Sequence, residues 1–214
     1  MKKFEIIVGS IAVFGIFLKI LHIPGGSILI GVAVMTLSIF YYVFSFAIFH
    51  GIKLRNIFKK VSYTDTNAKR IIGAIGLGWG ISLIIIGGEF KLELWQGAEI
   101  QLVTGLLFTG IILLIAIFFY FRNKVEYYKR IFKRILIYGG LGLILYLIPA
   151  TTFLELYYGS NPYYTEHPDF EKHYKKMLAE PYNSELREKL FQMGRGLEQM
   201  KYEKWLQERN DENK

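Results

Sequence analysis

Residues Ile100–Phe121 read IQLVTGLLFTGIILLIAIFFYF and contain no charged side chain. The apolar core of a bilayer is about 30 Å thick, and a helix needs about 20 apolar residues to cross it. A helix buried inside a soluble protein seldom stays apolar on every face over such a length. This stretch therefore predicts a transmembrane helix.

Four other blocks of similar length are also strongly apolar, namely Phe4–Leu21, Ile28–Phe49, Ile71–Gly88 and Ile135–Thr152. Most charged residues of the first 153 positions lie between the blocks. We therefore predict an all-α fold, a polytopic membrane helix bundle of about five spans over residues 1–153. Residues 154–214 form a short tail with balanced charge, which predicts a soluble helical segment.

Lysines and arginines gather on one side of the predicted spans. Of the 26 in the chain, 14 lie at the N-terminus and in the two loops after the second and fourth spans. The two opposite turns hold only Lys19 and Lys91. Since basic loops stay in the cytoplasm, we predict a multi-pass protein of the cell inner membrane with its N-terminus cytoplasmic and its tail extracytoplasmic.

The formal net charge of +8 fits the same arrangement. Basic side chains at the inner leaflet are attracted to anionic lipid by about 1 kcal/mol each. The lipid bilayer, and anionic lipid at the basic cytoplasmic loops, are therefore the expected partners, and no nucleic-acid partner is expected.

Two segments of the chain repeat each other. FLKILHIPGGSILIG, starting at Phe17, aligns with FKLELWQGAEIQLVTG, starting at Phe90, so that Lys19 falls on Lys91 and Gly25 on Gly97. We predict two tandem helical hairpins over residues 4–60 and 71–134, with residues 135–152 as a fifth span that begins a shortened third copy. In the first hairpin the turn is Pro24-Gly25-Gly26, because proline breaks a helix and glycine accepts positive φ.

The stretch FLKILHIPGG at Phe17–Gly26, between two apolar spans, resembles the N-terminal hairpin of the membrane subunit of the gliding-motility and type IX secretion motor (the GldL type). The resemblance covers Phe4–Phe49 and implies a membrane hairpin of two helices. It also implies a glutamate inside the second helix, aligned near Thr36–Leu37, where this chain has no acidic residue. That family has two spans and a long cytoplasmic coiled region, so we expect a shared hairpin and no motor activity.

Ionisable side chains close to the spans are the first functional candidates, because such groups are costly in a membrane. Lys19 and His22 lie one helical turn apart. They form either a proton or anion site at the outer mouth of the bundle, or an interfacial lysine beside a histidine that caps the turn.

A second group of candidates is Glu89, Lys91 and Glu93, with Glu99 beyond the turn. Acid–base pairing there would bind a cation or a basic patch of a partner. The alternative is an outer-surface loop whose charges face water.

Other kinds of site find little support. The chain has no cysteine, and its four histidines show no metal-ligand spacing, so we predict no metal site. The spans hold few polar residues, and no serine lies with a histidine and an acid as a catalytic triad requires. We expect no enzyme activity and no cofactor. Gly76 and Gly80 form a small-xxx-small pair, which favours close packing of helices in lipid.

The tail predicts two helices. The first begins near Pro168 and stops before Pro181, and the second begins with Ser184 as N-cap and ends near Arg209. Apolar residues of the second helix repeat at spacings of four and three, typical of a coiled-coil seam, at Leu186, Leu190, Met193, Leu197 and Met200. The seam either binds a membrane or periplasmic protein or folds back on the first helix through Phe170, Tyr174 and Met177.

These features favour a non-enzymatic scaffold or accessory subunit of a membrane assembly. The alternative is a small transporter or ion-conducting protein that uses Lys19, His22, Glu89 and Glu93. Variants of Lys19 and His22 that lose function without losing abundance would favour that alternative.

Overall fold

The computed structural model describes residues 2–21, 23, 25–64, 66–159 and 167–212, and every regular element among them is a helix. The chain separates into two compact units. The first comprises Met1–Glu93 with Gly97–Ile148, and the second comprises Leu94–Gln96 with Pro149–Lys214.

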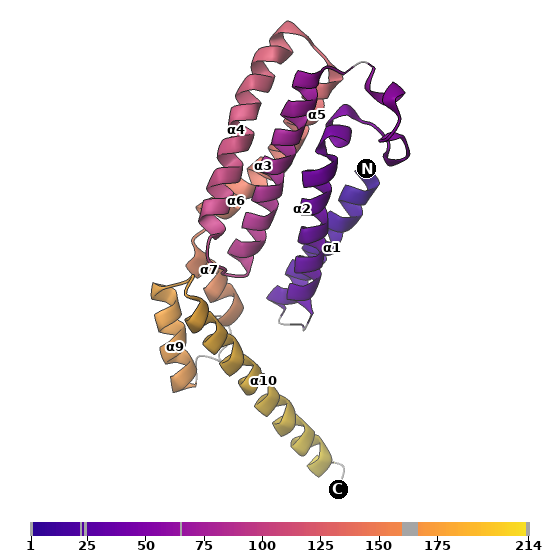
Figure 1. The fold of residues 1–214 in the computed structure, drawn as a ribbon. Helices are drawn as coiled ribbons and strands as arrows, with labels where there is room; N and C mark the ends of the chain where they lie inside the picture. Colours follow the sequence, from indigo (N-terminus) through magenta and orange to yellow (C-terminus); the bar gives the residue numbers. More distant parts are fainter. Residues whose placement is uncertain (1, 22, 24, 65, 160–166, 213–214) are drawn as a thin grey trace. The chain divides into compact units, whose positions relative to one another are not determined.

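The first unit is a bundle of membrane-length helices (Figure 1). Its elements are α1 (Lys2–Ile20), α2 (Gly26–His50), the 3-10 turns η1 (Leu54–Asn56) and η2 (Lys60–Tyr63), α3 (Ala68–Leu92), α4 (Ala98–Arg122), α5 (Glu126–Arg134), the π-helical turn η3 (Ile135–Gly139) and α6 (Gly140–Leu147). Helix α1 packs against α2, α2 against α3, and α3 against α4, while α6 contacts both α3 and α4. The core of the unit lies along α2 and α3, which carry most of its fully buried side chains.

Helices α2, α3 and α4 each have 25 residues and are long and apolar enough to cross a membrane. At a rise of 1.5 Å per residue each is about 37 Å long, which exceeds the apolar core of a bilayer. A fourth span is counted when the interrupted pair Glu126–Leu147 and Ala150–Gly159 is taken as one. The all-α fold is therefore confirmed, with three to four candidate membrane spans. Helix α1 has 19 residues and carries Lys3, Glu5 and Lys19, and the count of five spans stays a prediction.

The last apolar block is not one continuous helix. We expected an uninterrupted span over Ile135–Thr152, but α6 ends at Leu147 and the next helix begins at Ala150. Ile148 is extended (ψ 123°) and precedes Pro149. Proline disfavours the helical conformation of the residue before it and cannot donate the helical hydrogen bond. Hydropathy alone does not reveal this interruption.

The basic stretch after the fourth span is mostly helical. We expected a loop there, but Asn123–Val125 form the whole connection between α4 and α5. Helix α5 buries one face, made of Tyr127, Tyr128, Ile131 and Arg134, and leaves the face of Lys129 and Lys133 exposed. Residues spaced three and four apart share a helix face, so this stretch is amphipathic even though its charge count is typical of a loop.

Glycine allows α3 and α4 to touch. A methyl group on Gly80 would lie 3.0 Å from Cγ2 of Thr109, and one on Gly105 would lie 2.8 Å from the carbonyl oxygen of Gly80. Such spacing leaves no room for a side chain. A methyl group on Gly76 would lie 3.4 Å from Ile112 on the same helix α4. The predicted packing role is confirmed for Gly80, whereas the distance at Gly76 is an ordinary van der Waals contact that admits a methyl group.

The second unit contains α7 (Ala150–Leu154), the π-helical turn η4 (Glu155–Gly159), α9 (Pro168–Ala179) and α10 (Ser184–Glu212). Both predicted tail helices are present, but Ser184 is not the N-cap. The Oδ1 of Asn183 accepts hydrogen bonds of 3.1 Å from the backbone N–H groups of Glu185 and Leu186. An asparagine cap satisfies the first amides of a helix as well as serine does.

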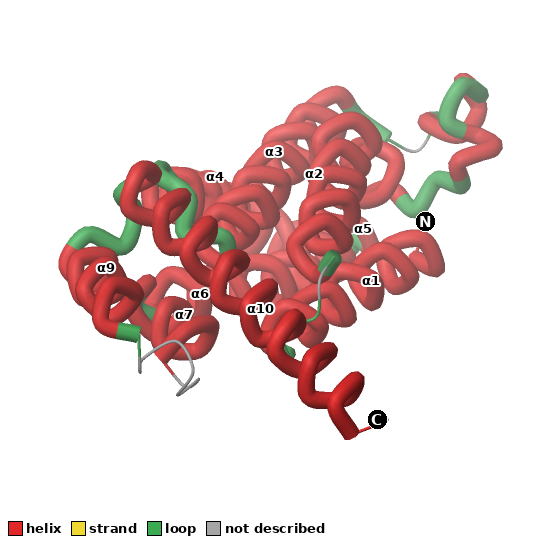
Figure 2. The backbone as a smooth tube through the Cα atoms, turned by 90° about the horizontal axis from the view of Figure 1, so that it is seen from below, coloured by secondary structure: helices red, strands yellow, loops and turns green. Residues whose placement is uncertain are grey.

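The first half of α10 folds back on α9. Leu190 and Leu197 of the seam are buried, as are the α9 residues Phe170, Tyr174 and Met177. Helix α9 has 12 residues and α10 has 29, so α10 runs well past the end of its neighbour (Figures 1 and 2). Met200, at the far end of the seam, is 52% exposed. The seam therefore packs within the chain over its first part, and a partner for the rest stays a prediction.

Candidate functional site: charged clusters at the two ends of the bundle

The predicted candidates Lys19 and Glu93 meet at the end of the bundle where α1 turns into α2 and α3 turns into α4. The Nζ of Lys19 lies 2.7 Å from Oε1 of Glu93 and donates a hydrogen bond of 3.2 Å to the carbonyl oxygen of Leu92. Ser27, in the first turn of α2, donates to the other carboxylate oxygen at 3.4 Å. Lys19 from the first candidate group and Glu93 from the second thus belong to one cluster, which joins the last turn of α1 to the C-cap of α3.

Lys91, which aligns with Lys19 in the sequence, lies in the last turn of α3. Its Nζ donates to Oε1 of Glu99, in the first turn of α4, at 3.1 Å. The lysine side chain is 1% exposed, whereas that of Glu99 is 54% exposed. The whole side chain of Lys91, its ammonium group included, is therefore enclosed, and its charge is paired with a carboxylate that faces solvent.

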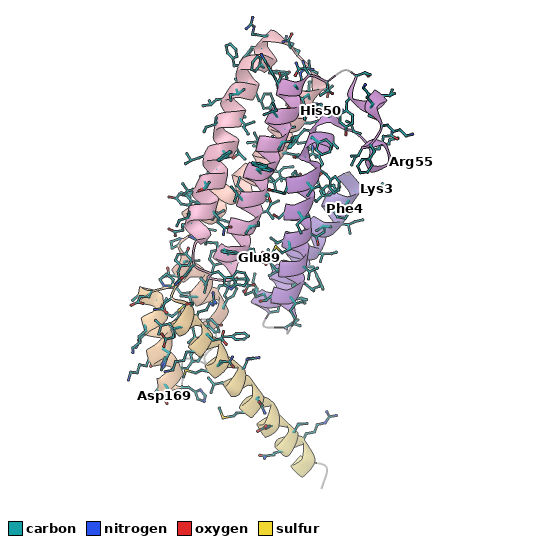
Figure 3. All side chains as sticks on the ribbon, in the orientation of Figure 1. Lys3, Phe4, His50, Arg55, Glu89 and Asp169 are labelled. Carbon is teal, nitrogen blue, oxygen red and sulfur yellow. The ribbon has the colours of Figure 1, made fainter. Side chains whose placement is uncertain are left out.

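Glu89 lies one turn before Glu93 on the side of α3 that faces α2 (Figure 3). It is 6% exposed, and a methyl group on Gly31 would lie 3.1 Å from its Oε1, so glycine makes room for the carboxylate. The interpretation of this region as a water-facing loop is wrong for Glu89 and Lys91. Helix α3 continues four residues past the predicted end at Gly88 and carries both side chains into the bundle.

His22 lies outside the described residues, so its pairing with Lys19 stays a prediction. Pro24 is also outside them, but the glycine of each turn is described. Gly25 (φ 96°) precedes α2 and Gly97 (φ 85°) precedes α4. Both lie in the left-handed region that glycine adopts without strain.

A second charged cluster, which the sequence analysis missed, lies toward the other end of the bundle. The Nη2 of Arg134 lies 2.8 Å from Oε2 of Glu5, and its Nε donates to Oε1 at 3.3 Å. The Tyr41 hydroxyl donates to Oε1 of Glu5 and accepts from Nε of Arg134 at 3.1 Å. Tyr138 donates to the same carboxylate at 3.4 Å. One carboxylate therefore receives bonds from three side chains, and we call these four residues the inner network.

Two members of the inner network, Tyr41 and Arg134, lie inside the bundle. Tyr41 is fully buried and Arg134 is 8% exposed, and the guanidinium carbon lies 5.5 Å from the ring centre of Phe49. Tyr41 is nine residues from the end of α2, and Arg134 is eight residues from the start of α5. At 1.5 Å per residue these positions are about 12 to 14 Å from the helix ends. The guanidinium of Arg134 is thus largely enclosed by the bundle, where a polar group needs a partner, and Glu5 reaches it from the first turn of α1 with a side chain that is 13% exposed.

Two signals in the sequence pointed to this network. Glu5 is the only acidic residue inside any of the five apolar blocks. Arg134 follows Tyr127 by seven residues, and both lie on the buried face of α5. A π-helical turn, η3, begins directly after Arg134 and contains Tyr138. Such turns are rare and often occur at functional positions.

These contacts mainly fasten helices to each other. Helix α1 packs along α2, and ion pairs tie it to α3 at one end and to α5 at the other. In the middle of the bundle the hydroxyls of Ser38 and Ser82 lie 2.5 Å apart and join α2 to α3. Within the described part of the chain, no three His, Asp or Glu side chains are placed to hold a metal ion.

Comparison with known proteins adds no relative. No protein-family model, characterised protein or solved structure matches the chain. The function is therefore argued from the charged clusters and from the two units themselves.

Proposed function

We propose that the chain is a non-enzymatic scaffold or accessory subunit of a membrane assembly. The observation that carries this proposal is the use made of charge in the bundle. Glu5, Arg134, Lys19 and Glu93 bind one another across helices. Charges that pair between helices fix their arrangement, whereas a conduction path needs polar groups that face a passage.

The proposed topology has five spans, with α1 as the first and α5 to α6 as the last. Helix α1 is about 28 Å long at 1.5 Å per residue, close to the thickness of a bilayer core. Its acidic residue, Glu5, is neutralised by Arg134, which lowers the cost of placing it in lipid. Under the positive-inside rule the N-terminus is cytoplasmic, the protein lies in an inner membrane, and the second unit is extracytoplasmic.

The tandem repeat is part of the same proposal, and equivalent contacts 72 positions apart support it. A methyl group on Gly15 would lie 2.9 Å from Ile30, and one on Gly87 would lie 2.8 Å from the backbone nitrogen of Leu102. Ile30 and Leu102 are both fully buried. Each hairpin thus closes with a glycine against a large aliphatic residue, above a turn glycine of positive φ. The resemblance to the motor subunit concerns the first hairpin alone.

The distal part of α10 is the proposed contact with a protein partner. Beyond Leu197, Met200 and Leu206 are exposed by 52% and 37%. An isolated helix of this composition is marginal in water, so packing against another protein would stabilise it.

The experiment that tests the proposal is crosslinking of the full chain in native membranes, followed by purification in mild detergent and mass spectrometry. A stoichiometric partner crosslinked to α10 supports the proposal. Met200→Glu should abolish that crosslink, and the matched variant Gln207→Glu, on an exposed position of the same helix, should keep it. A chain that purifies alone, with no crosslink through α10, would overturn the accessory-subunit function.

One observation favours the transporter alternative. Glu89 is a buried carboxylate to which no described side chain donates a hydrogen bond, in a cluster near the mouth of the bundle. If it binds a proton or cation, the purified chain in liposomes should show ion flux that Glu89→Gln abolishes and Glu99→Gln, on an exposed side chain, retains. Equal flux in the two variants, or none in the wild type, would reject this alternative.

A further inference from the structure

The segment between α2 and α3, residues 51–64, exposes large apolar side chains on the surface of the protein. Phe58 is 96% exposed and Val61 is 79% exposed, the two highest values among the large apolar side chains that the structure describes. An apolar side chain of this size loses free energy when it stays in water. Two such side chains, three residues apart, would be stabilised by contact with lipid or another molecule that removes them from water.

Inward contacts fix the conformation that exposes these residues. Ile52 and Ile57 are buried against Ala47 of α2. The Tyr63 hydroxyl donates to the carbonyl oxygen of Ile57 at 2.8 Å, and its ring packs against Phe46 with centroids 6.2 Å apart. Phe58 is therefore held outward by a segment that is itself anchored to the bundle.

The same segment is strongly basic. Exposed lysines and an arginine surround Phe58, at Lys53, Arg55, Lys59 and Lys60. No acidic residue occurs from Gly51 to Thr64. Apolar side chains set among cations match the headgroup layer of an anionic leaflet, with phosphates outside and acyl chains beneath.

The position of the segment fits the same layer. It begins at Gly51, directly after the last residue of α2. Figure 1 shows it beside the helices near the level where α2 ends, Figure 2 shows it to one side of them, and Figure 3 shows Arg55 on its outer edge. A segment beside a transmembrane bundle at this level faces the lipid surface.

We propose that the segment Gly51–Thr64 is a lipid-binding anchor. Phe58 and Val61 insert among the acyl chains of an anionic leaflet, and Lys53, Arg55, Lys59 and Lys60 bind lipid phosphates. This inference rests on the proposed function in one respect, the placement of α2 and α3 across a membrane, and it names the lipid class that one loop recognises. The anchor fixes the rotation of α2 and α3 about their axes and their depth in the bilayer.

The absence of cysteine from the sequence permits a clean test with single reporters. Val61→Cys carries an environment-sensitive fluorophore and leaves Phe58 in place. Thr64→Cys, also exposed and three residues away, is the matched control. The full chain is placed in nanodiscs of phosphatidylcholine alone or with phosphatidylglycerol, and quenching is measured with nitroxide-labelled lipid and with aqueous iodide.

The expected result is blue-shifted emission and strong lipid quenching of the Val61 reporter in anionic discs, with iodide quenching of the Thr64 reporter. Phe58→Ser, and separately Lys59→Gln with Lys60→Gln, should reduce lipid quenching of the Val61 reporter several-fold. Folding is checked by the unchanged elution of each variant.

Equal access of iodide to both reporters, with no lipid quenching, would overturn the proposal. So would shielding of Val61 that needs an added acidic protein and not anionic lipid, which would make the segment a protein-docking loop. The test uses purified chain and defined lipid only. A missing α10 partner therefore leaves its result intact, and a failed lipid anchor leaves the accessory-subunit function untouched.

Discussion

The two ends of α1 are both held by ion pairs, but the two pairs lie in different surroundings. Lys19 is one residue from the end of its helix, and its partner Glu93 is the C-cap of α3, so both lie near the turns. Glu5 and Arg134 lie in the inner network, where two tyrosine hydroxyls complete the bonding. Side-chain exposure differs little, 16% and 15% for Lys19 and Glu93 against 13% and 10% for Glu5 and Arg134, so the second end is distinguished by its bonding partners, the hydroxyls of Tyr41 and Tyr138.

The difference shows what each end can contribute. Ion pairs near water change stability by about 1 kcal/mol or less. A pair in the apolar interior is also of modest net value, but removal of one partner leaves an unpaired charge and is costly. The inner network should therefore determine whether α1 stays in place. The cluster of Lys19, Glu93 and Ser27 at the turns, which we call the outer cluster, should tolerate substitution.

The largest effect is expected at the inner network. Glu5→Ala leaves the guanidinium of Arg134 buried without its carboxylate and should lower the free energy of unfolding by about 3 to 5 kcal/mol. The measurement is equilibrium unfolding of the detergent-solubilised chain. The double variant Glu5→Met with Arg134→Met removes both charges and should recover most of the loss. A single variant that costs less than about 1 kcal/mol would show that water reaches the network.

A smaller loss is expected when one hydroxyl of the network is removed. Tyr41→Phe keeps the ring but deletes a donor to Glu5 and an acceptor for Arg134, which should cost about 1.5 to 3 kcal/mol. The neighbouring Tyr42 is 55% exposed and stacks on Trp79 at the surface. Tyr42→Phe is therefore the matched control, with an expected change within about 0.5 kcal/mol. Equal effects at the two positions would contradict the enclosed character of the network.

The same comparison explains what the sequence could predict. The outer cluster follows a local pattern, a lysine before a glycine turn that occurs twice, so its residues could be named in advance. The inner network joins residues 129 positions apart. Its acid was visible as a charge inside an apolar block, but its base was counted among loop residues because the face of α5 was not considered.

The errors in the fold have similar causes. Apolar length located the helices of the first four blocks, with ends within four residues of those observed. Hydropathy does not register backbone conformation, so it did not predict that Pro149 would force Ile148 out of the helix and interrupt the last block. Charge counts are likewise insensitive to periodicity, so they missed α5. Local conformational rules would have revealed both.

The turns at the outer end permit a test of the repeat. Gly25→Ala and Gly97→Ala force a Cβ into the left-handed region and should each cost about 1 to 2 kcal/mol. Gly9 lies inside α1 with open space around it, so Gly9→Ala should instead stabilise the chain, by up to about 1 kcal/mol. Unfolding midpoints of the three variants give the comparison. A marked difference between Gly25 and Gly97 would argue against equivalent hairpins.

The smallest effect is expected for the outer ion pair. Lys19→Met keeps the apolar stem but removes the charge, and it should cost about 1 kcal/mol or less because Glu93 and Ser27 lie near the end of the bundle. The difference between wild type and variant should shrink as sodium chloride is raised toward 1 M, where charges near water are screened within about 3 Å. Glu5→Ala should keep more of its effect in the same salt series, since its partners Arg134 and Tyr41 are buried. A loss at Lys19 as large as that at Glu5, unchanged by salt, would mean that water and ions are excluded equally from both ends of α1.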